Sequence, residues 1–188
     1  MRVCLTSKKN IIKIKVGENS MIIMYVRHAD ASGDKLTELG KKQCELMVMQ
    51  DDGFEFSKIY SSPMKRCEDT SKFLADKYNL EIELCEDLGE RKVLKGLPNT
   101  DDEKEWFNNY LNPNFSHENP EGCKEFLDRT AKVLDKIIAA HKDKNENVIL
   151  SAHSCTLYAI MAYFNKSGAN KINWYRVSNC AKVFFEIN

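Results

Sequence analysis

The hydrophobic residues of this chain follow two spacings, one typical of buried strands and one typical of amphipathic helices. Short apolar and β-branched runs predict strands at residues 21–26, 58–60, 80–84, 147–151 and 181–187. Between them, apolar positions three or four residues apart predict helices that open at 36–40, follow Pro63, and span 122–142 and 156–164. Because strands alternate with helices, we expect an α/β fold with a mostly parallel open sheet and helices on both faces.

The first two predicted helices have recognisable ends and faces. In the first, Thr37 is a candidate N-cap. Its buried face is expected to carry Leu36, Leu39, Leu46 and Met47. In the second, we expect Ser62 at the N-cap and Pro63 in the first turn. Its inward face is expected to carry Met64, Cys67, Ser71, Leu74 and Tyr78.

Two segments depart from this alternation. Residues 1–20 are rich in lysine and partly alternate, so they form either an edge strand or an extension before the main domain at 21–188. Residues 85–120 are rich in Asp, Glu, Asn and Pro, with aromatic residues between them. We expect the second segment to be a lid-like insertion that contains a short helix at about 101–110.

The composition excludes several classes of protein. The chain has 188 residues, enough for one domain with a substantial core. Lys plus Arg equals Asp plus Glu at 28 each, so we expect no nucleic-acid partner and no membrane attachment. The seven cysteines are odd in number and include no Cys-x-x-Cys pair, which favours reduced thiols over disulfides or a zinc site. Reduced thiols predict a cytoplasmic protein.

Cationic and imidazole side chains follow three of the predicted strands. Arg27 and His28 come directly after the first strand, where alone they could simply end it. Arg66 and His153 come shortly after two later strands. The carboxyl ends of parallel strands meet at one edge of a sheet, so we expect these side chains to converge. Arg66 lies in the first turn of a helix and Ser154 is a candidate N-cap, and helix N-termini favour anions. The set predicts a phosphate pocket.

Six short segments carry a family resemblance. They are RHA at 27–29, LTELG at 36–40, SSPMKRCEDT at 61–70, LGER at 88–91, EG at 121–122 and SAHS at 151–154. Each segment is weak evidence alone, whereas the ordered set covers most of residues 21–187. In these segments the chain resembles the histidine phosphatase superfamily, which includes phosphoglycerate mutases and many small phosphatases. The resemblance implies a phosphoglycerate mutase-like fold and a phosphatase reaction.

The resemblance also implies roles for single residues. His28 would attack phosphorus and become phosphohistidine, a reaction open to a neutral imidazole near pH 7. Arg27, Arg66 and His153 would hold the phosphoryl oxygens. Glu90 would protonate the leaving oxygen and then activate water. No metal or other cofactor is implied, and the substrate would be a small-molecule phosphomonoester or a phosphoprotein.

Several positions depart from the family pattern and leave alternatives open. Ala29 replaces the usual glycine, and Asp34 would repel phosphate if it pointed inward. The short loop after His28 favours a phosphatase over a phosphoglycerate mutase-type transferase, which remains an alternative. A non-catalytic phosphate-binding regulatory domain is another, and Glu90 could belong to a surface charge cluster with Glu86 and Asp87. The sequence names neither the substrate nor the oligomeric state.

Overall fold

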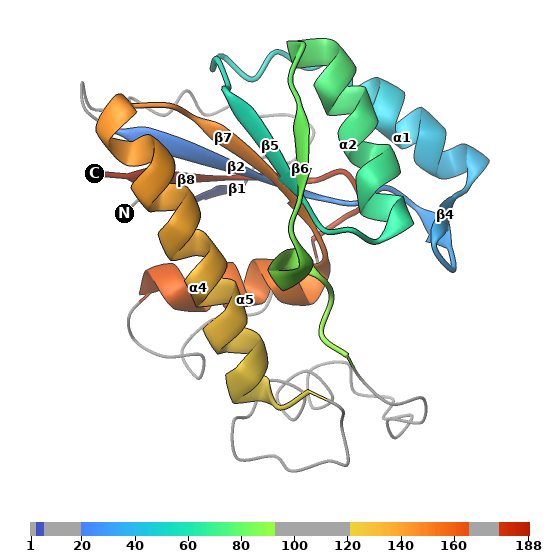
Figure 1. The fold of residues 1–188 in the computed structure, drawn as a ribbon. Coiled ribbons are helices and arrows are strands. Elements are labelled where there is room, and N and C mark those ends of the chain that lie inside the picture. Colours follow the sequence, from blue (N-terminus) through green and yellow to red (C-terminus); the bar gives the residue numbers. More distant parts are fainter. Residues whose placement is uncertain (1–2, 6–19, 93–120, 166–176) are drawn as a thin grey trace.

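The computed structural model describes residues 3–5, 20–92, 121–165 and 177–188, which form a mixed sheet flanked by helices (Figure 1). Its strands are β1 (Val3–Leu5), β2 (Met21–Arg27), β5 (Lys58–Ser61), β6 (Ile82–Leu84), β7 (Val148–Ala152) and β8 (Lys182–Ile187). In the described part of the chain their order is β1-β8-β2-β7-β5-β6. β2, β7, β5 and β6 are parallel, whereas β8 is antiparallel to β2 and β1 to β8.

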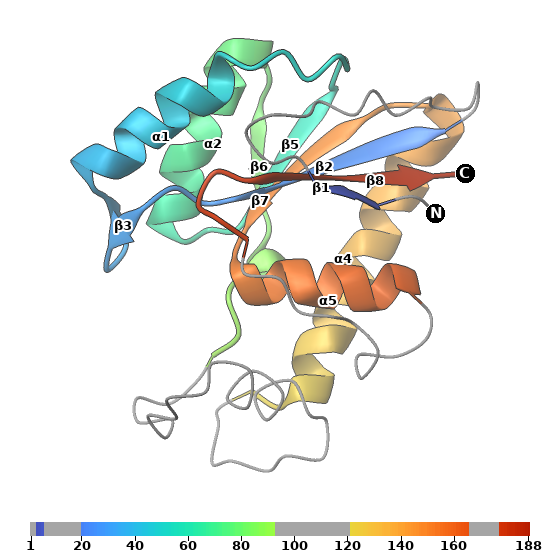
Figure 2. The same ribbon diagram turned by 180° about the vertical axis from the view of Figure 1, so that it is seen from behind.

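Helices cover both faces of this sheet, which confirms the expected α/β fold. The longer helices are α1 (Glu38–Val48), α2 (Lys65–Tyr78), α4 (Cys123–His141) and α5 (Ser154–Asn165). α1 and α2 lie on one face, and α4 and α5 on the other (Figures 1 and 2). The remaining described elements are β3 (Ala31–Ser32), β4 (Lys35–Leu36), η1 (Glu86–Leu88) and η2 (Lys142–Lys144). None of the described helices is long and apolar enough to cross a membrane.

β2 lies inside the sheet and is buried on both faces. The odd-numbered residues of 21–26 pack into the core of α4 and α5, and the even-numbered ones into the core of α1 and α2. Burial on two faces explains why the run is continuously apolar. The register places Arg27 opposite Ala152 of β7, and Ser61 of β5 opposite Ser151. The carboxyl ends of these three strands therefore lie at the same edge of the sheet.

The predicted buried face of α1 is confirmed for Met47 and wrong for its three leucines. Leu39 and Leu46 are 59% and 60% exposed, and Leu36 belongs to β4. The buried residues of this helix are Gly40, Cys44 and Met47. The reason is close packing at Gly40, where a Cβ atom would lie 2.0 Å from the carbonyl oxygen of Asp30. Two of the three buried residues of α1, Gly40 and Cys44, are small, so a pattern based on leucine does not identify the packed side.

The start of α1 agrees with the sequence prediction, whereas the start of α2 differs. Thr37 is the N-cap of α1, and its Oγ1 accepts a hydrogen bond from the backbone N of Gly40 at 3.0 Å. The N-cap of α2 is Met64, so Pro63 precedes the helix and Ser62 is not its cap. The buried residues of α2 are Cys67, Thr70, Ser71 and Leu74, which confirms most of its predicted inward face.

Two predictions fall largely outside the described residues. Of the lid-like insertion at about 85–120, residues 85–92 are described, and they contain η1. The short helix predicted at about 101–110 lies outside the described ranges. Of the first twenty residues, those at 3–5 form β1, which pairs with β8 at the edge of the sheet.

Candidate active site

The chain segment after β2 is fixed from two neighbouring elements. The backbone N of His28 donates a hydrogen bond to the carbonyl oxygen of Ala152 in β7 at 3.0 Å. The backbone N of Ala29 donates to Oγ1 of Thr70 in α2, also at 3.0 Å. These contacts hold the backbone of His28 between β7 and α2, at the carboxyl edge of the sheet.

Arg66 connects the two imidazoles. Its Nε donates a hydrogen bond to Nε2 of His28 at 3.2 Å, and its Nη2 lies 3.2 Å from Nδ1 of His153. The two imidazole rings meet edge to face, with centroids 5.2 Å apart. Arg66 is in the first turn of α2, whereas the two histidines follow β2 and β7. Three elements that are distant in sequence thus bring residues 28, 66 and 153 together.

The hydrogen bonds of His28 define which ring nitrogen can act as a nucleophile. Nδ1 lies 2.7 Å from the carbonyl oxygen of Ala29, which can only accept, so Nδ1 carries the proton. Nε2 has the lone pair, which accepts the hydrogen bond from Arg66. Burial, together with the positive charges of Arg66 and Arg27, lowers the pKa of His28 to about 4. The imidazole is therefore neutral at pH 7.

His153 is a second neutral imidazole and is fully buried. Burial, followed by the charge of Arg66, lowers its pKa to about 2. Its Nδ1 faces Arg66 and its Nε2 lies 2.8 Å from Oγ of Ser62, so Nε2 carries the proton. The hydroxyl of Tyr25 donates a hydrogen bond to the backbone oxygen of His153 at 2.6 Å. These contacts keep Nδ1 directed at the guanidinium.

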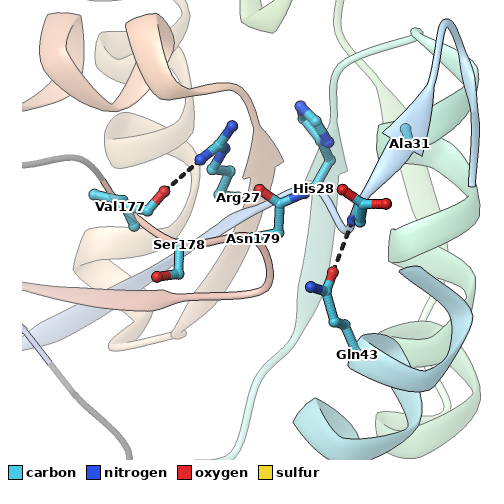
Figure 3. A pocket seen from close by; sticks show the side chains of 8 residues that line it. Arg27, His28, Ala31, Gln43, Val177, Ser178 and Asn179 are labelled. Atoms are coloured by element: carbon cyan, nitrogen blue, oxygen red, sulfur yellow. Dashed lines mark hydrogen bonds between the residues drawn. The ribbon is translucent and has the colours of Figure 1, made fainter. Parts of the chain in front are cut away.

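A pocket of about 480 Å³ opens beside His28 (Figure 3). Its lining consists of Arg27, His28, Asp30, Ala31, Gln43, Val177, Ser178 and Asn179. Figure 3 shows the guanidinium of Arg27 turned toward Val177, whose carbonyl oxygen accepts a hydrogen bond from Nη1. Nε of Arg27 is buried and has no hydrogen-bond partner among the described residues. The charge of Arg27 also lowers the pKa of His28 and of His153, so it acts on both imidazoles.

Asp34 takes a place in the site that the sequence did not predict. It lies in the hairpin between β3 and β4, and its Oδ1 accepts hydrogen bonds from Nη1 and the backbone N of Arg66 at 3.1 and 3.3 Å. Its Oδ2 accepts from the backbone N of Lys65 at 2.9 Å. The carboxylate therefore occupies the amides at the N-terminus of α2, where anions are favoured. Because Asp34 holds Nη1, the Nε and Nη2 side of the guanidinium faces the imidazoles.

Replacing Asp34 with asparagine is expected to strengthen the binding of inorganic phosphate. The substitution removes the negative charge of Asp34 that competes with phosphate for Arg66. The dissociation constant of inorganic phosphate should therefore fall about three- to fivefold, which corresponds to ~0.7–1 kcal/mol. Titration calorimetry with inorganic phosphate measures this change. Asp69→Asn is the matched control, because Asp69 lies on α2 with Arg66 but pairs with Lys65 and Lys72 instead. Unchanged or weaker phosphate binding in Asp34→Asn would contradict the expectation.

Glu90 follows η1 and lies within the field of the same cations. Its Oε1 accepts a hydrogen bond from the backbone N of Arg91 at 3.1 Å, and the thiol of Cys155 also hydrogen-bonds to the carboxyl group. Burial raises the pKa of Glu90, and this effect exceeds the opposing effects of those hydrogen bonds and of Arg66 and Arg27. A partly buried carboxyl group with a raised pKa can hold a proton beside a cationic site.

Ser154 is the first residue of α5, so its predicted N-cap role is wrong. The residue before it, His153, takes that position. Accordingly, the backbone oxygen of His153 accepts the first hydrogen bond of the helix, from the N of Leu157 at 3.0 Å. Ser154 therefore lies in the first turn of α5, immediately beside the buried imidazole.

The positive charge of the site comes from arginine. Among the described residues, no group of three or more His, Cys, Asp or Glu side chains is arranged to hold a metal ion. Arg27 and Arg66 place two permanent positive charges around His28. A guanidinium group can hold two phosphate oxygens at once, so this arrangement is suited to a phosphoryl group.

Similarity to known proteins extends over nearly the whole chain. The model of the histidine phosphatase superfamily (branch 1) matches residues 19–188. A 2,3-bisphosphoglycerate-dependent phosphoglycerate mutase from Thermoplasma acidophilum is 22% identical over 181 residues. The match covers 95% of this chain and 88% of the relative.

Solved structures with a similar fold include proteins described as phosphatases. An alpha-ribazole-5'-P phosphatase from Escherichia coli has a TM-score of 0.72 at 19% identity, over 90% of this chain and 92% of its own. A mycobacterial glucosyl-3-phosphoglycerate phosphatase has a TM-score of 0.69 at 18% identity, over 89% of this chain and 90% of its own. At these identities, the likeness to each solved structure shows a shared fold alone.

Proposed function

This chain belongs to the histidine phosphatase superfamily, and we propose that it hydrolyses phosphomonoesters through a phosphohistidine on His28, without a metal ion. The state of His28 carries the proposal. Its Nε2 is unprotonated and directed at the guanidinium of Arg66. A phosphoryl group bound to that guanidinium would meet the ring nitrogen that can attack it.

In the proposed first step, Nε2 of His28 attacks phosphorus while the bond from phosphorus to the ester oxygen breaks. Phosphoryl oxygens replace the imidazoles as acceptors for Nε and Nη2 of Arg66. Glu90 donates its proton to the leaving oxygen, a role that its raised pKa supports. The products of this step are a free alcohol, an ionised Glu90 and a phosphohistidine.

In the proposed second step, water hydrolyses the phosphohistidine. The Glu90 carboxylate accepts a proton from water as the water oxygen attacks phosphorus and the bond from phosphorus to Nε2 breaks. Inorganic phosphate leaves, and both His28 and Glu90 return to their starting protonation states. The same carboxyl group thus serves as acid and then as base.

Cations and the N-terminus of α5 would stabilise the negative charge in both steps. Arg66 and Arg27 supply the permanent charges, and the buried Nε of Arg27 is available as a donor among the described residues. We assign His153 and the first-turn amide of Ser154 to the remaining phosphoryl oxygens. For His153 this role requires a proton on Nδ1, which the negative charge of the bound phosphoryl group favours.

We assign the organic part of the substrate to the pocket beside His28. The pocket volume of about 480 Å³ suits a small molecule. Amide and hydroxyl groups of Gln43, Ser178 and Asn179 line it, and such groups bind hydroxyl or amide functions. A small phosphomonoester with polar substituents is therefore the proposed substrate.

A phosphoglycerate mutase-type transfer is the second candidate. The Thermoplasma acidophilum relative, named as a 2,3-bisphosphoglycerate-dependent phosphoglycerate mutase, favours it. In that reaction the phosphohistidine would pass its phosphoryl group to another hydroxyl rather than to water. The short hairpin of β3 and β4 favours hydrolysis, because it leaves less protein to enclose a bisphosphate.

Release of phosphate from an aryl phosphate in excess EDTA tests the proposal. We expect catalytic turnover that EDTA does not reduce. Transfer of phosphate between the positions of phosphoglycerate, with little hydrolysis, would support the mutase instead. Binding of inorganic phosphate without turnover of any ester in a panel of phosphorylated metabolites would support a non-catalytic regulatory domain and contradict both enzymatic candidates.

The two site imidazoles are expected to stay neutral well below neutral pH. The pKa of His28 is lowered to about 4 and that of His153 to about 2, because burial disfavours the charged form. In the phosphate-free protein, their ¹³Cε1 resonances should therefore stay unchanged between pH 8 and pH 6. Histidine-selective labelling measures this, and the His28→Ala spectrum assigns the first signal. A His28 midpoint near the ordinary pKa of about 6.5 would contradict the expectation.

A further inference from the structure

Arg129 of α4 binds the backbone that carries Glu90. Its Nη1 donates to the carbonyl oxygens of Asp87 and Gly89 at 2.7 and 3.0 Å. Its Nη2 donates to the carbonyl oxygen of Glu90 at 3.2 Å. Its Nε and Nη2 also donate to the two carboxylate oxygens of Glu121. These five hydrogen bonds match the five N–H groups of a guanidinium.

Further contacts fix the same segment. Oγ1 of Thr156 in α5 donates to the carbonyl oxygen of Leu88 at 3.3 Å. Four consecutive carbonyl groups, at residues 87–90, therefore accept hydrogen bonds from side chains of α4 and α5. The backbone N of Lys92 donates to Oε2 of Glu121 at 3.0 Å, so the partner of Arg129 also holds the end of the segment.

We propose that Arg129 is a positioning residue for Glu90, and that it keeps the carboxyl group where the leaving oxygen of the substrate departs. The inference rests on the proposed function, in which Glu90 is the proton donor. Water could satisfy the carbonyl groups of an exposed turn, yet here an arginine from another helix holds them. A general acid acts only within hydrogen-bond reach of the oxygen it protonates, and a shift of about 1 Å can lower a rate about 100-fold.

The test compares a poor and a good leaving group. An alkyl oxygen needs a proton as it leaves, whereas a nitrophenyl oxygen leaves without one. We expect Glu90→Gln to lower kcat/KM about 100-fold for an alkyl phosphate and no more than about fivefold for nitrophenyl phosphate. If Arg129 acts through Glu90, then Arg129→Gln should show the same pattern, with losses of about 30-fold and no more than about threefold.

A double mutant separates positioning from a general structural role. In the Glu90→Gln background, Arg129→Gln should change kcat/KM for the alkyl phosphate by less than about twofold, because the group that it positions is already absent. A further loss of about 30-fold in that background would overturn the inference. Equal losses for the two esters in the Arg129→Gln single mutant would overturn it as well.

Two more variants complete the design. Glu121→Gln weakens the hold on Arg129 and should give the same leaving-group pattern at about fivefold, even if Arg129→Gln folds poorly. Lys124→Gln is the matched control, because it removes an exposed ion pair with Asp128 on the same helix and should leave both rates unchanged. If Glu121→Gln slows both esters equally, the inference fails.

The inference and the proposed function can fail separately. If Glu90→Gln slows both esters equally, Glu90 is not the proton donor, and both ideas fail at that point. If Glu90→Gln shows the expected leaving-group pattern and Arg129→Gln does not, only the positioning role of Arg129 is rejected.

Discussion

The His28→Ala variant is expected to keep its fold and to lose kcat by about 10⁴-fold or more. The substitution removes the nitrogen that would form the covalent bond to phosphorus, and neither of the other two histidines in the described part of the chain is placed to replace it. Arg66 contacts Nδ1 of His153 as it does Nε2 of His28, but His153 is fully buried, whereas His28 is only partly buried. Steady-state release of phosphate from nitrophenyl phosphate measures the loss, and circular dichroism checks the fold.

Chemical trapping gives this expectation a second readout. Acid-labile, base-stable phosphate should accumulate on the wild-type protein after rapid mixing with substrate, and His28→Ala should show none. His141→Ala is the matched control. His141 is also buried, but it hydrogen-bonds to Tyr60 and Glu146 at the C-terminal end of α4. Turnover by His28→Ala at the rate of the His141→Ala protein would show that the nucleophile is another residue.

The Arg66→Lys variant is expected to have the second-largest effect, a loss of about 10³-fold in kcat. Lysine keeps the positive charge but cannot present two N–H groups in one plane, as Nε and Nη2 do here. Stabilisation of phosphoryl oxygens by two matched donors would therefore be lost where charge develops. Steady-state kinetics with nitrophenyl phosphate, run at saturating substrate, measures the change.

The control for this variant is Lys65→Gln, which removes the neighbouring cation of α2. Lys65 is exposed and pairs with Asp69 and Glu68 rather than with the imidazoles. We expect it to change kcat less than about twofold. If Arg66→Lys kept more than about a tenth of wild-type kcat, the planar guanidinium would not be the main source of phosphoryl stabilisation.

The parts of the site that follow from strand order were predictable from the sequence. Residues 21–26 form an uninterrupted apolar run because β2 is buried on both faces, and that run identifies an interior strand. Once β2 and β7 are parallel, His28 and His153 must lie at the same edge. The position of Arg66 at this edge was predictable for the same reason, because α2 begins just after the parallel strand β5.

Other features depend on contacts that residue spacing does not encode. The hydrophobic pattern did not identify the buried side of α1, because Gly40 and Cys44 are small. They lie there because the backbone packs closely, not because they are hydrophobic. The direction of Asp34 depends on the hairpin of β3 and β4, whose two-residue strands leave almost no pattern. Arg129 looks like an ordinary surface arginine of α4 until the carbonyl groups at 87–90 are placed against it.

The carboxylate of Asp34 at the N-terminus of α2 has a consequence for turnover. An enzyme that liberates inorganic phosphate works in a growing concentration of its own product, and a hollow lined by cations alone would retain that product. If the site hydrolyses phosphomonoesters as proposed, the carboxylate of Asp34 would compete for Arg66, which would shorten the residence time of the product dianion and lower the affinity for the incoming ester. In that case the hairpin would weaken the binding of substrate and speed the release of phosphate.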